Sequence, residues 1–383
     1  MEFLMRAFRF FIAASVLFSL IFVGCSRTIK YRGHAGIEPP QDMGWKYYRY
    51  DELNSGFVDR IVKTPLDQLW EFKTGAAVNA QMLADKTFIL AGDLAGNLYL
   101  IDDYSGKRLG KMKFKGGFSA APYLGDSILY FGTDIKASKA GAIDYYDGDI
   151  LWKIPGRDFI GQIDYGWGML YTGETDGRLT AWRADDGAEI WKKDLDGSIV
   201  TGCFLKDTIV YSGTEKGMLY AFDHRTGAEI FIKKTDATLQ GHIASDGDAL
   251  YICSFDSAIF KFNSNTGAVL WKLKTDGAFR CGVSIAGDTL YACSSNGKLY
   301  AIDCMTSEQY FEYDAGTPLI ASPLATRDKV FIGTLGGVLY AIDRFTGMNI
   351  SEYCAESPIV SSPILFKDII IISCENRRLY ALR

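Results

Sequence analysis

The sequence predicts an all-β fold, an eight-bladed β-propeller of four-stranded antiparallel blades. A phrase of the type Leu-Tyr-Ala-Ile-Asp recurs eight times between Leu98 and Arg383, at steps of 39 to 42 residues. Each unit contains four short apolar segments separated by Gly and Asp turns, a pattern typical of β-hairpins. Segments with helical periodicity are absent from the repeats. Four-stranded units with a period of ~40 residues indicate propeller blades rather than a helical solenoid.

The seventh unit shows the expected strands. They cover residues 320–325, 330–333, 338–343 and 348–353. The eighth unit ends after its third strand, whereas residues 69–75 precede the first unit and have the pattern of a fourth strand. We expect this N-terminal strand to complete the last blade, because closure of the ring leaves no sheet edge open to other chains.

Composition narrows the function classes. The chain has 383 residues, 48% of them hydrophobic, and a net charge of −5. An acidic chain offers no basic face to phosphates, so nucleic acid is not an expected partner. Three His residues are too few for most multi-histidine metal sites. The chain is long enough to bury a large core.

The N-terminus resembles a bacterial lipoprotein signal. Arg6 and Arg9 precede an apolar run over residues 10–23, which is short for a membrane span and suits a signal peptide. A Gly and then Cys25 follow, as in a lipobox. Cys25 is therefore the predicted lipidation site and mature N-terminus, with an ordinary cleaved signal and a chance Cys as the alternative.

These features divide the chain into three parts. We expect a signal peptide over residues 1–24, a lipidated Cys and tether over 25–68, and the propeller over 69–383. The residue after the Cys is Ser26 rather than Asp, which by resemblance to enteric lipoproteins favours the outer membrane. The predicted location is the periplasmic face of the outer membrane of a Gram-negative bacterium, with membrane attachment through the lipid.

The remaining cysteines are expected to be small buried residues more than disulfide partners. No Cys-x-x-Cys pair occurs, so neither a thioredoxin-like site nor covalent haem is indicated. An odd number also leaves at least one thiol free. The seven are Cys203, Cys253, Cys281, Cys293, Cys304, Cys354 and Cys374.

The extended phrase Leu-Tyr-Ala-Ile-Asp-x-x-Thr-Gly-x-x-Leu-Trp resembles the repeat of the pyrroloquinoline-quinone (PQQ) type propellers. Residues 217–230 and 259–271 are the closest copies, and the resemblance covers residues 69–383. Two groups share this repeat. One is the quinoprotein dehydrogenases, and the other is the BamB-type lipoprotein subunit of the outer-membrane β-barrel assembly machinery. Length, blade number, lipobox and tether are similar to the second group.

An enzyme of the first group would need a quinone, an ion held by oxygen ligands and a carboxylate base. The resemblance also implies a pair of adjacent Cys residues, which this chain lacks. The many Asp residues fall at fixed turn positions, where Asp caps its own backbone. We therefore predict no catalytic residues, no metal site and no cofactor, and the chain is not expected to be an enzyme.

Partner binding is expected on the face that carries the loops between blades and the loops between second and third strands. Three loop segments there depart from the plain Thr-Asp-Gly pattern, and an Arg beside a Phe suits an interface hot spot. The candidate residues are Arg157, Asp158, Phe159, Gln240, His242, Phe279 and Arg280. An ordinary exposed loop is the alternative at each of them.

The resemblance implies a non-catalytic scaffold in outer-membrane β-barrel assembly, whose partner is the barrel-assembly subunit or another envelope protein. Two alternatives stay open at this point. One is a quinone-binding or quinoprotein-like protein, and the other is a ligand-sensing envelope lipoprotein.

Overall fold

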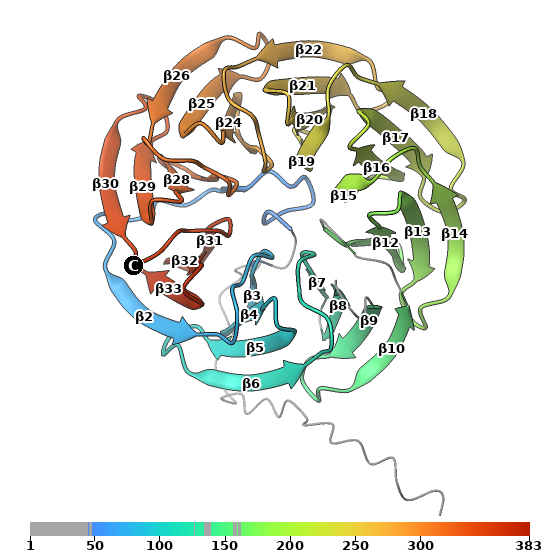
Figure 1. Ribbon diagram of the computed structural model, residues 1–383, viewed down its shortest axis with the longest axis horizontal. Coiled ribbons are helices and arrows are strands. Elements are labelled where there is room, and N and C mark those ends of the chain that lie inside the picture. Colours follow the sequence, from blue (N-terminus) through green and yellow to red (C-terminus); the bar gives the residue numbers. More distant parts are fainter. Residues whose placement is uncertain (1–44, 46–47, 126, 134–138, 156–158, 160–161) are drawn as a thin grey trace, which may run out of the picture.

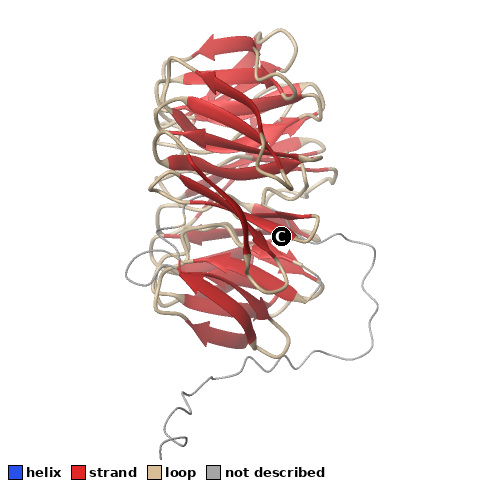
Figure 2. Cartoon of the chain, turned by 90° about the vertical axis from the view of Figure 1, so that its right-hand side faces the viewer, coloured by secondary structure: helices blue, strands red, loops and turns tan. Residues whose placement is uncertain are grey.

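The computed structural model describes residues 45, 48–125, 127–133, 139–155, 159 and 162–383. Every regular element in these residues is a β-strand. The strands form eight sheets that stand around a common axis as the blades of a propeller (Figure 1). Seen from the side, the molecule is a flat disc (Figure 2). The predicted fold class is confirmed.

Each blade runs from an inner to an outer strand, and the first four blades follow each other along the chain. Blade 1 comprises β3 (Leu83–Asp85), β4 (Phe88–Gly92), β5 (Asn97–Asp102) and β6 (Arg108–Lys113). Blade 2 comprises β7 (Tyr123–Leu124), β8 (Ile128–Gly132), β9 (Lys139–Asp144) and β10 (Ile150–Pro155). Blade 3 comprises β11 (Asp164–Gly166), β12 (Met169–Gly173), β13 (Arg178–Arg183) and β14 (Glu189–Asp194). Blade 4 comprises β15 (Ile199–Lys206), β16 (Ile209–Thr214), β17 (Met218–Asp223) and β18 (Glu229–Lys234).

The next three blades repeat this order. Blade 5 comprises β19 (Leu239–Ser245), β20 (Ala249–Ser254), β21 (Ala258–Asn263) and β22 (Val269–Lys274). Blade 6 comprises β23 (Ser284–Ala286), β24 (Thr289–Cys293), β25 (Lys298–Asp303) and β26 (Gln309–Asp314). Blade 7 comprises β27 (Leu324–Thr326), β28 (Lys329–Gly333), β29 (Val338–Asp343) and β30 (Asn349–Cys354), and the short β1 (Phe57–Val58) joins its inner edge in parallel.

Blade 8 contains both ends of the propeller. Its inner strands are β31 (Ile364–Phe366), β32 (Ile369–Cys374) and β33 (Arg378–Leu382), and its outer strand is β2 (Gln68–Lys73). β2 runs antiparallel to β33, with Trp70 opposite Ala381. The N-terminal strand therefore closes the ring as the sequence predicted, with backbone hydrogen bonds across the joint.

Burial follows strand position. The second and third strands lie between two neighbouring blades and are buried on both faces, which accounts for their nearly continuous apolar sequence. The outer strands face water on one side and alternate, as in β18 with Phe231 buried and its neighbours exposed. The repeated Leu-Tyr-Ala phrase thus encodes a strand that packs on two sheets at once.

An aromatic side chain on the outer strand joins each of several blades to the next one. The Trp191 indole Nε1–H donates to the carbonyl oxygen of His224 at 2.9 Å. Its ring covers Gly227, where an added Cβ would lie 2.8 Å from the indole and φ is +65°. A side chain at Gly227 would meet both the ring and an unfavourable backbone conformation. The aromatic residue of one blade therefore contacts the Thr-Gly turn of the next blade, which explains why both recur in the repeat.

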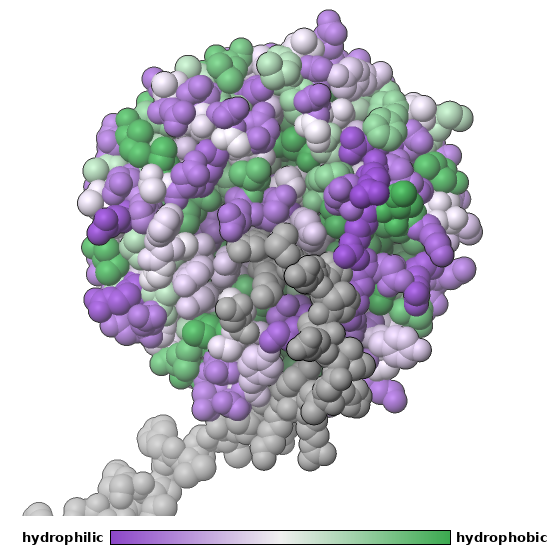
Figure 3. Space-filling view, turned by 180° about the vertical axis from the view of Figure 1, so that it is seen from behind, coloured by the Kyte–Doolittle hydropathy of each residue, from purple (hydrophilic) through white to green (hydrophobic). Residues whose placement is uncertain are grey.

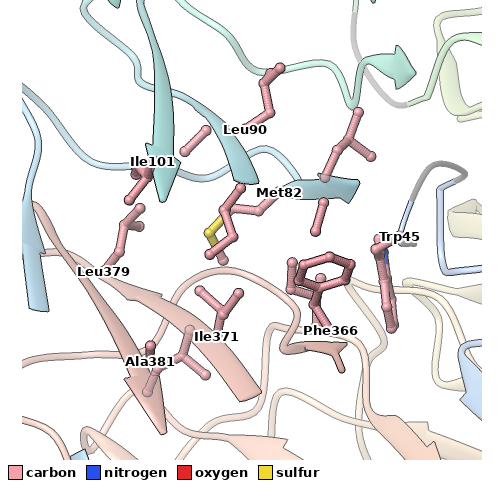
Figure 4. Close-up of a cluster of buried hydrophobic side chains, with 14 of the residues drawn as sticks. Trp45, Met82, Leu90, Ile101, Phe366, Ile371, Leu379 and Ala381 are labelled. Atoms are coloured by element: carbon pink, nitrogen blue, oxygen red, sulfur yellow. The ribbon is translucent and has the colours of Figure 1, made fainter. Parts of the chain in front are cut away.

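The hydrophobic core is largest where blade 8 meets blade 1. Met82 and Ile101 from blade 1 pack with Ile371 and Leu379 from blade 8 (Figure 4). Trp45, which precedes the propeller repeats, is fully buried at the edge of this cluster beside Phe366 (Figure 4). Side-chain packing thus joins the last blade to the first, in addition to the strand pairing that completes blade 8.

Candidate functional site

Residues 48–58, called the axial segment from here on, fill the centre of the ring. In Figure 1 this blue stretch crosses the middle of the propeller and then runs outward before it becomes β2. Its backbone carbonyls at Leu53 and Ser55 accept hydrogen bonds from the amides of Ser245 and Ile285, at 2.9 and 2.8 Å. These amides belong to the inner strands of blades 5 and 6, so the segment is hydrogen-bonded to the inner edges of neighbouring blades.

Arg49 is the most deeply buried charge of the axial segment, with 1% of its surface exposed. Its Nη2 donates to Ser284 Oγ at 2.6 Å and to the carbonyl oxygens of Val283 and Pro323. Burial lowers the pKa of the guanidinium. Nε and Nη1 have no hydrogen-bond partner among the described residues. The hydrogen bonds of this buried guanidinium all go to carbonyl and hydroxyl oxygens, while the carboxyl of Asp51 in the same segment interacts with its charge.

The backbone of the axial segment is bent to make these contacts. Arg49, Tyr50 and Asn54 have φ values of 57°, 86° and 54°, in the left-handed region that side chains other than Gly rarely adopt. Asn54 Nδ2 donates to Gln162 Oε1 and to the carbonyl oxygen of Ile243, both at 3.0 Å. Contacts to blade 5 and to the residue at the start of blade 3 hold this conformation in place.

A cavity of about 220 Å³ lies next to the axial segment, called the axial cavity from here on. Tyr48 forms part of its wall, with its ring 4.2 Å from that of His242. The starts of the inner strands supply most of the rest, including Ala80, Gly241, Cys281 and Ala321, which are small as crowding near the axis requires. A Cβ on Gly241 would lie 2.3 Å from the Cys281 carbonyl oxygen.

Polar side chains of the axial cavity are neutral or cationic. Gln81, Gln240 and His242 line it together with the Arg280 side chain. His242 Nδ1 lies 3.3 Å from the carbonyl oxygen of Thr201, to which it can only donate. Burial, and then the charge of Arg49, lower the pKa of His242 to about 4. The imidazole is therefore neutral at pH 7, and no carboxylate lines the cavity among the described residues.

The structure separates the predicted partner-binding residues into three sets. Gln240, His242 and Arg280 meet at the axial cavity. Phe159 and Phe279 are buried, and their rings are not part of the surface. Arg157 and Asp158, like the lipidation candidate Cys25, lie outside the described residues.

Arg280 is the exposed member of the first set. Its guanidinium lies 5.0 Å from the centre of the Phe255 ring, which is 44% exposed. Arg280 belongs to the loop between blades 5 and 6, and Phe255 to the turn between β20 and β21. Loops of the two kinds therefore share one face, as the sequence predicted. Phe279, the residue beside Arg280 in the sequence, is buried, and the Arg280 guanidinium pairs with Phe255 instead.

Sequence reasoning missed Gln81 and the axial segment. The only signal in that stretch was the group of aromatic residues between Trp45 and Tyr50, which was compatible with part of the tether lying on the domain surface. The described part of that stretch instead lies inside the ring.

The Asp residues that end the third strands cap turns, as expected. Asp223 Oδ1 accepts hydrogen bonds from the backbone amides of Arg225 and Thr226, at 3.1 and 2.9 Å. The hydroxyl of Thr226 donates to the same oxygen, and these bonds lower the pKa of the Asp223 carboxyl. No cluster of three or more His, Cys, Asp or Glu side chains in the described part of the chain could hold a metal ion.

The seven cysteines in the described part of the chain are free thiols, and six of them are buried. Cys354, on the outer strand β30, is the exposed one. Burial raises the pKa of the Cys281 thiol to about 11, which makes it unreactive at neutral pH.

The axial cavity does not fit a quinone with its ion. Tyr48 and Arg49 of the chain itself fill the centre of the ring. The described lining also offers no carboxylate to hold a cation such as Ca²⁺, which requires oxygen ligands. No reaction step can therefore be assigned to a quinone here.

Among the described residues, none form a helix that could span a membrane.

Fold and repeat together define the class: the protein is an eight-bladed β-propeller with PQQ-like repeats. The particular family follows from its sequence. The model of the family described as "Outer membrane protein assembly factor BamB" matches residues 136–257 and 255–383, so the chain belongs to this family.

Solved structures share the fold at low identity. BamB from Moraxella catarrhalis is 15% identical, with a TM-score of 0.72, over 83% of this chain and 100% of that one. A europium-containing methanol dehydrogenase is 12% identical, with a TM-score of 0.73, over 86% and 89%. A quinohemoprotein alcohol dehydrogenase from Pseudomonas putida is 12% identical, with a TM-score of 0.77, over 89% and 80%. No curated protein matches the sequence.

Proposed function

We propose that the protein is a non-catalytic, lipid-anchored scaffold that acts in outer-membrane β-barrel assembly on the periplasmic side of the outer membrane. The family match over residues 136–383 is the observation that carries this proposal. The signal-like N-terminus supports it, because Cys25 would tie the propeller to the membrane and raise its effective concentration near a membrane partner. Several acyl chains make such an anchor stable.

The filled axis supports a role without catalysis. Tyr48 and Arg49 occupy the centre that a quinone-dependent relative would need for its cofactor. The fold is shared with dehydrogenases, so fold alone does not separate the two functions. We expect purified protein to bind no pyrroloquinoline quinone in the presence of Ca²⁺ by calorimetry, and to reduce no dye with alcohols. Saturable binding of the quinone would favour the alternative that the protein is a quinone-dependent dehydrogenase.

Arg280 and Phe255 are the surface residues that we assign to partner binding. An exposed guanidinium stacked on a half-exposed aromatic ring is a frequent centre of protein interfaces. Figure 3 shows the face opposite to these loops. Where it is not covered by residues drawn in grey, its hydrophobic residues are scattered among hydrophilic ones. The proposal therefore concentrates on the loop face.

The test is mild crosslinking followed by affinity capture of the tagged, full-length chain from detergent-solubilised membranes, with mass spectrometry of the captured proteins. We expect an outer-membrane barrel of the assembly machinery. Arg280→Glu should lower its recovery about tenfold. The matched control is Arg225→Glu, an exposed Arg in the turn between β17 and β18, which should leave recovery unchanged. Capture of a dehydrogenase or a cytochrome instead would contradict the proposal.

A further inference from the structure

Gln81 is buried without a partner inside a cavity. Only 6% of its surface is exposed, and its side chain lines the axial cavity. Neither Oε1 nor Nε2 has a hydrogen-bond partner among the described residues. Buried amide groups are almost always paired, so this side chain presents an unused donor and an unused acceptor to whatever enters the cavity.

The charge around the cavity favours an anion. Arg280 lines it at the surface, and Arg49 lies close enough below to lower the pKa of His242. The described lining includes no Asp or Glu, and the carboxyl of Asp51, which interacts with Arg49, is not part of it. The whole chain carries a charge of −5, so this positive region is local and does not follow from composition.

The size and lining select among anions. The volume of about 220 Å³ is below the ~300–1,000 Å³ of pockets for drug-sized ligands, so the cavity suits a smaller molecule. Asn79, Gln81, Gln240 and Ser362 are neutral polar residues of the lining. Such residues hydrogen-bond to a ligand that carries further oxygens, whereas an apolar acid would leave them unpaired.

We infer that the axial cavity binds a small, polar carboxylate, whose charged group meets Arg280 while its other oxygens meet Gln81 and the neighbouring amides. Arginine pairs with carboxylates through two parallel hydrogen bonds, which makes it suited to the mouth of such a site. The carboxylate can belong to a free small molecule or to the end of a peptide. This inference does not depend on the assembly role.

The test is isothermal titration calorimetry on the purified full-length protein in detergent. Succinate and citrate probe the free small molecule, and a tripeptide with a free C-terminus, against the same peptide amidated, probes the peptide source. Succinamide is the uncharged control. We expect saturable binding of at least one carboxylate below about 10 mM, and none of succinamide.

Two variants test the assignment. Arg280→Gln should weaken carboxylate binding at least about tenfold, because it removes the charge while the Gln amide still offers N–H donors. Gln81→Leu should weaken it as well, and its circular dichroism spectrum reports whether the fold is kept. Arg225→Gln is the matched control and should bind like the unmodified protein. Absence of saturable heat with every carboxylate, or equal affinity in Arg280→Gln, would overturn the inference.

Discussion

Truncation of Trp70 tests how the ring is closed. Trp70 lies on β2, the N-terminal strand of blade 8, and only 7% of its surface is exposed. Its indole Nε1–H donates to the Asp103 carbonyl oxygen of blade 1 at 2.8 Å. Its ring covers Gly106, where an added Cβ would lie 2.7 Å away. Trp70→Ala therefore removes a contact between the first and the last blade.

The expected cost follows from burial. A buried aromatic side chain removes ~150–250 Å² from water, and Trp→Ala changes in cores cost about 3–5 kcal/mol. We therefore expect Trp70→Ala to lower the free energy of unfolding by about 4 kcal/mol. Unfolding entropy of roughly 2.1 cal/mol/K per residue over the span from Gln68 to Arg383 converts this into a fall in Tm of about 6 °C.

The measurement is thermal unfolding followed by circular dichroism, with urea unfolding as a second probe. Trp167→Ala is the matched control. Trp167 is 69% exposed, although its indole also donates to a backbone carbonyl, that of Asp207 at 3.0 Å. The control should lose less than about 1 kcal/mol, since an exposed side chain contributes little burial. Equal losses in the two variants would refute the view that ring closure depends on the buried indole.

Three further predictions rest on other parts of the molecule. Gly227→Ala should lower Tm by several degrees, because its Cβ would meet the Trp191 ring at a φ of +65°; a Tm equal to that of the unmodified protein would contradict this contact. Burial raises the pKa of the Asp164 carboxyl from 3.8 to about 7, so the folded state binds the extra proton between these values and stability should fall as pH rises from ~4 to ~7. Asp164→Asn should reduce the pH dependence of the free energy of unfolding, measured by urea unfolding at several pH values. An unchanged pH dependence would show that other groups cause it. Cys25→Ser should move the protein from the membrane fraction to the soluble fraction. Unchanged fractionation would contradict the prediction of a lipid anchor at Cys25.

Periodicity explains how much of the site could be predicted. Arg280 and His242 stood out because their loops break a pattern that other blades keep, and the structure brings both to the axial cavity. Phe279 stood out for the same reason, yet it is buried, because a departure from a repeat marks a special position without telling which way the side chain points. Gln81 breaks no pattern, and only the geometry around its amide makes it conspicuous.

The sequence by itself determined the number of blades and the closure of the ring. A strand is specified by neighbours two residues apart and a blade by turns a few residues long, so eight copies of one phrase encode eight blades. The missing fourth strand of the last copy left one way to pair the strand at residues 69–75, and β2 pairs in that way.

Only the tertiary structure decided what fills the axis. Arg49 and Ser284, which are hydrogen-bonded to each other, stand 235 positions apart in the chain. No local period links such residues, because their contact depends on the width of the channel left when eight blades pack side by side. The ring must form before its centre exists as a place that a segment can occupy, so the axial segment and the cavity beside it are properties of the assembled fold.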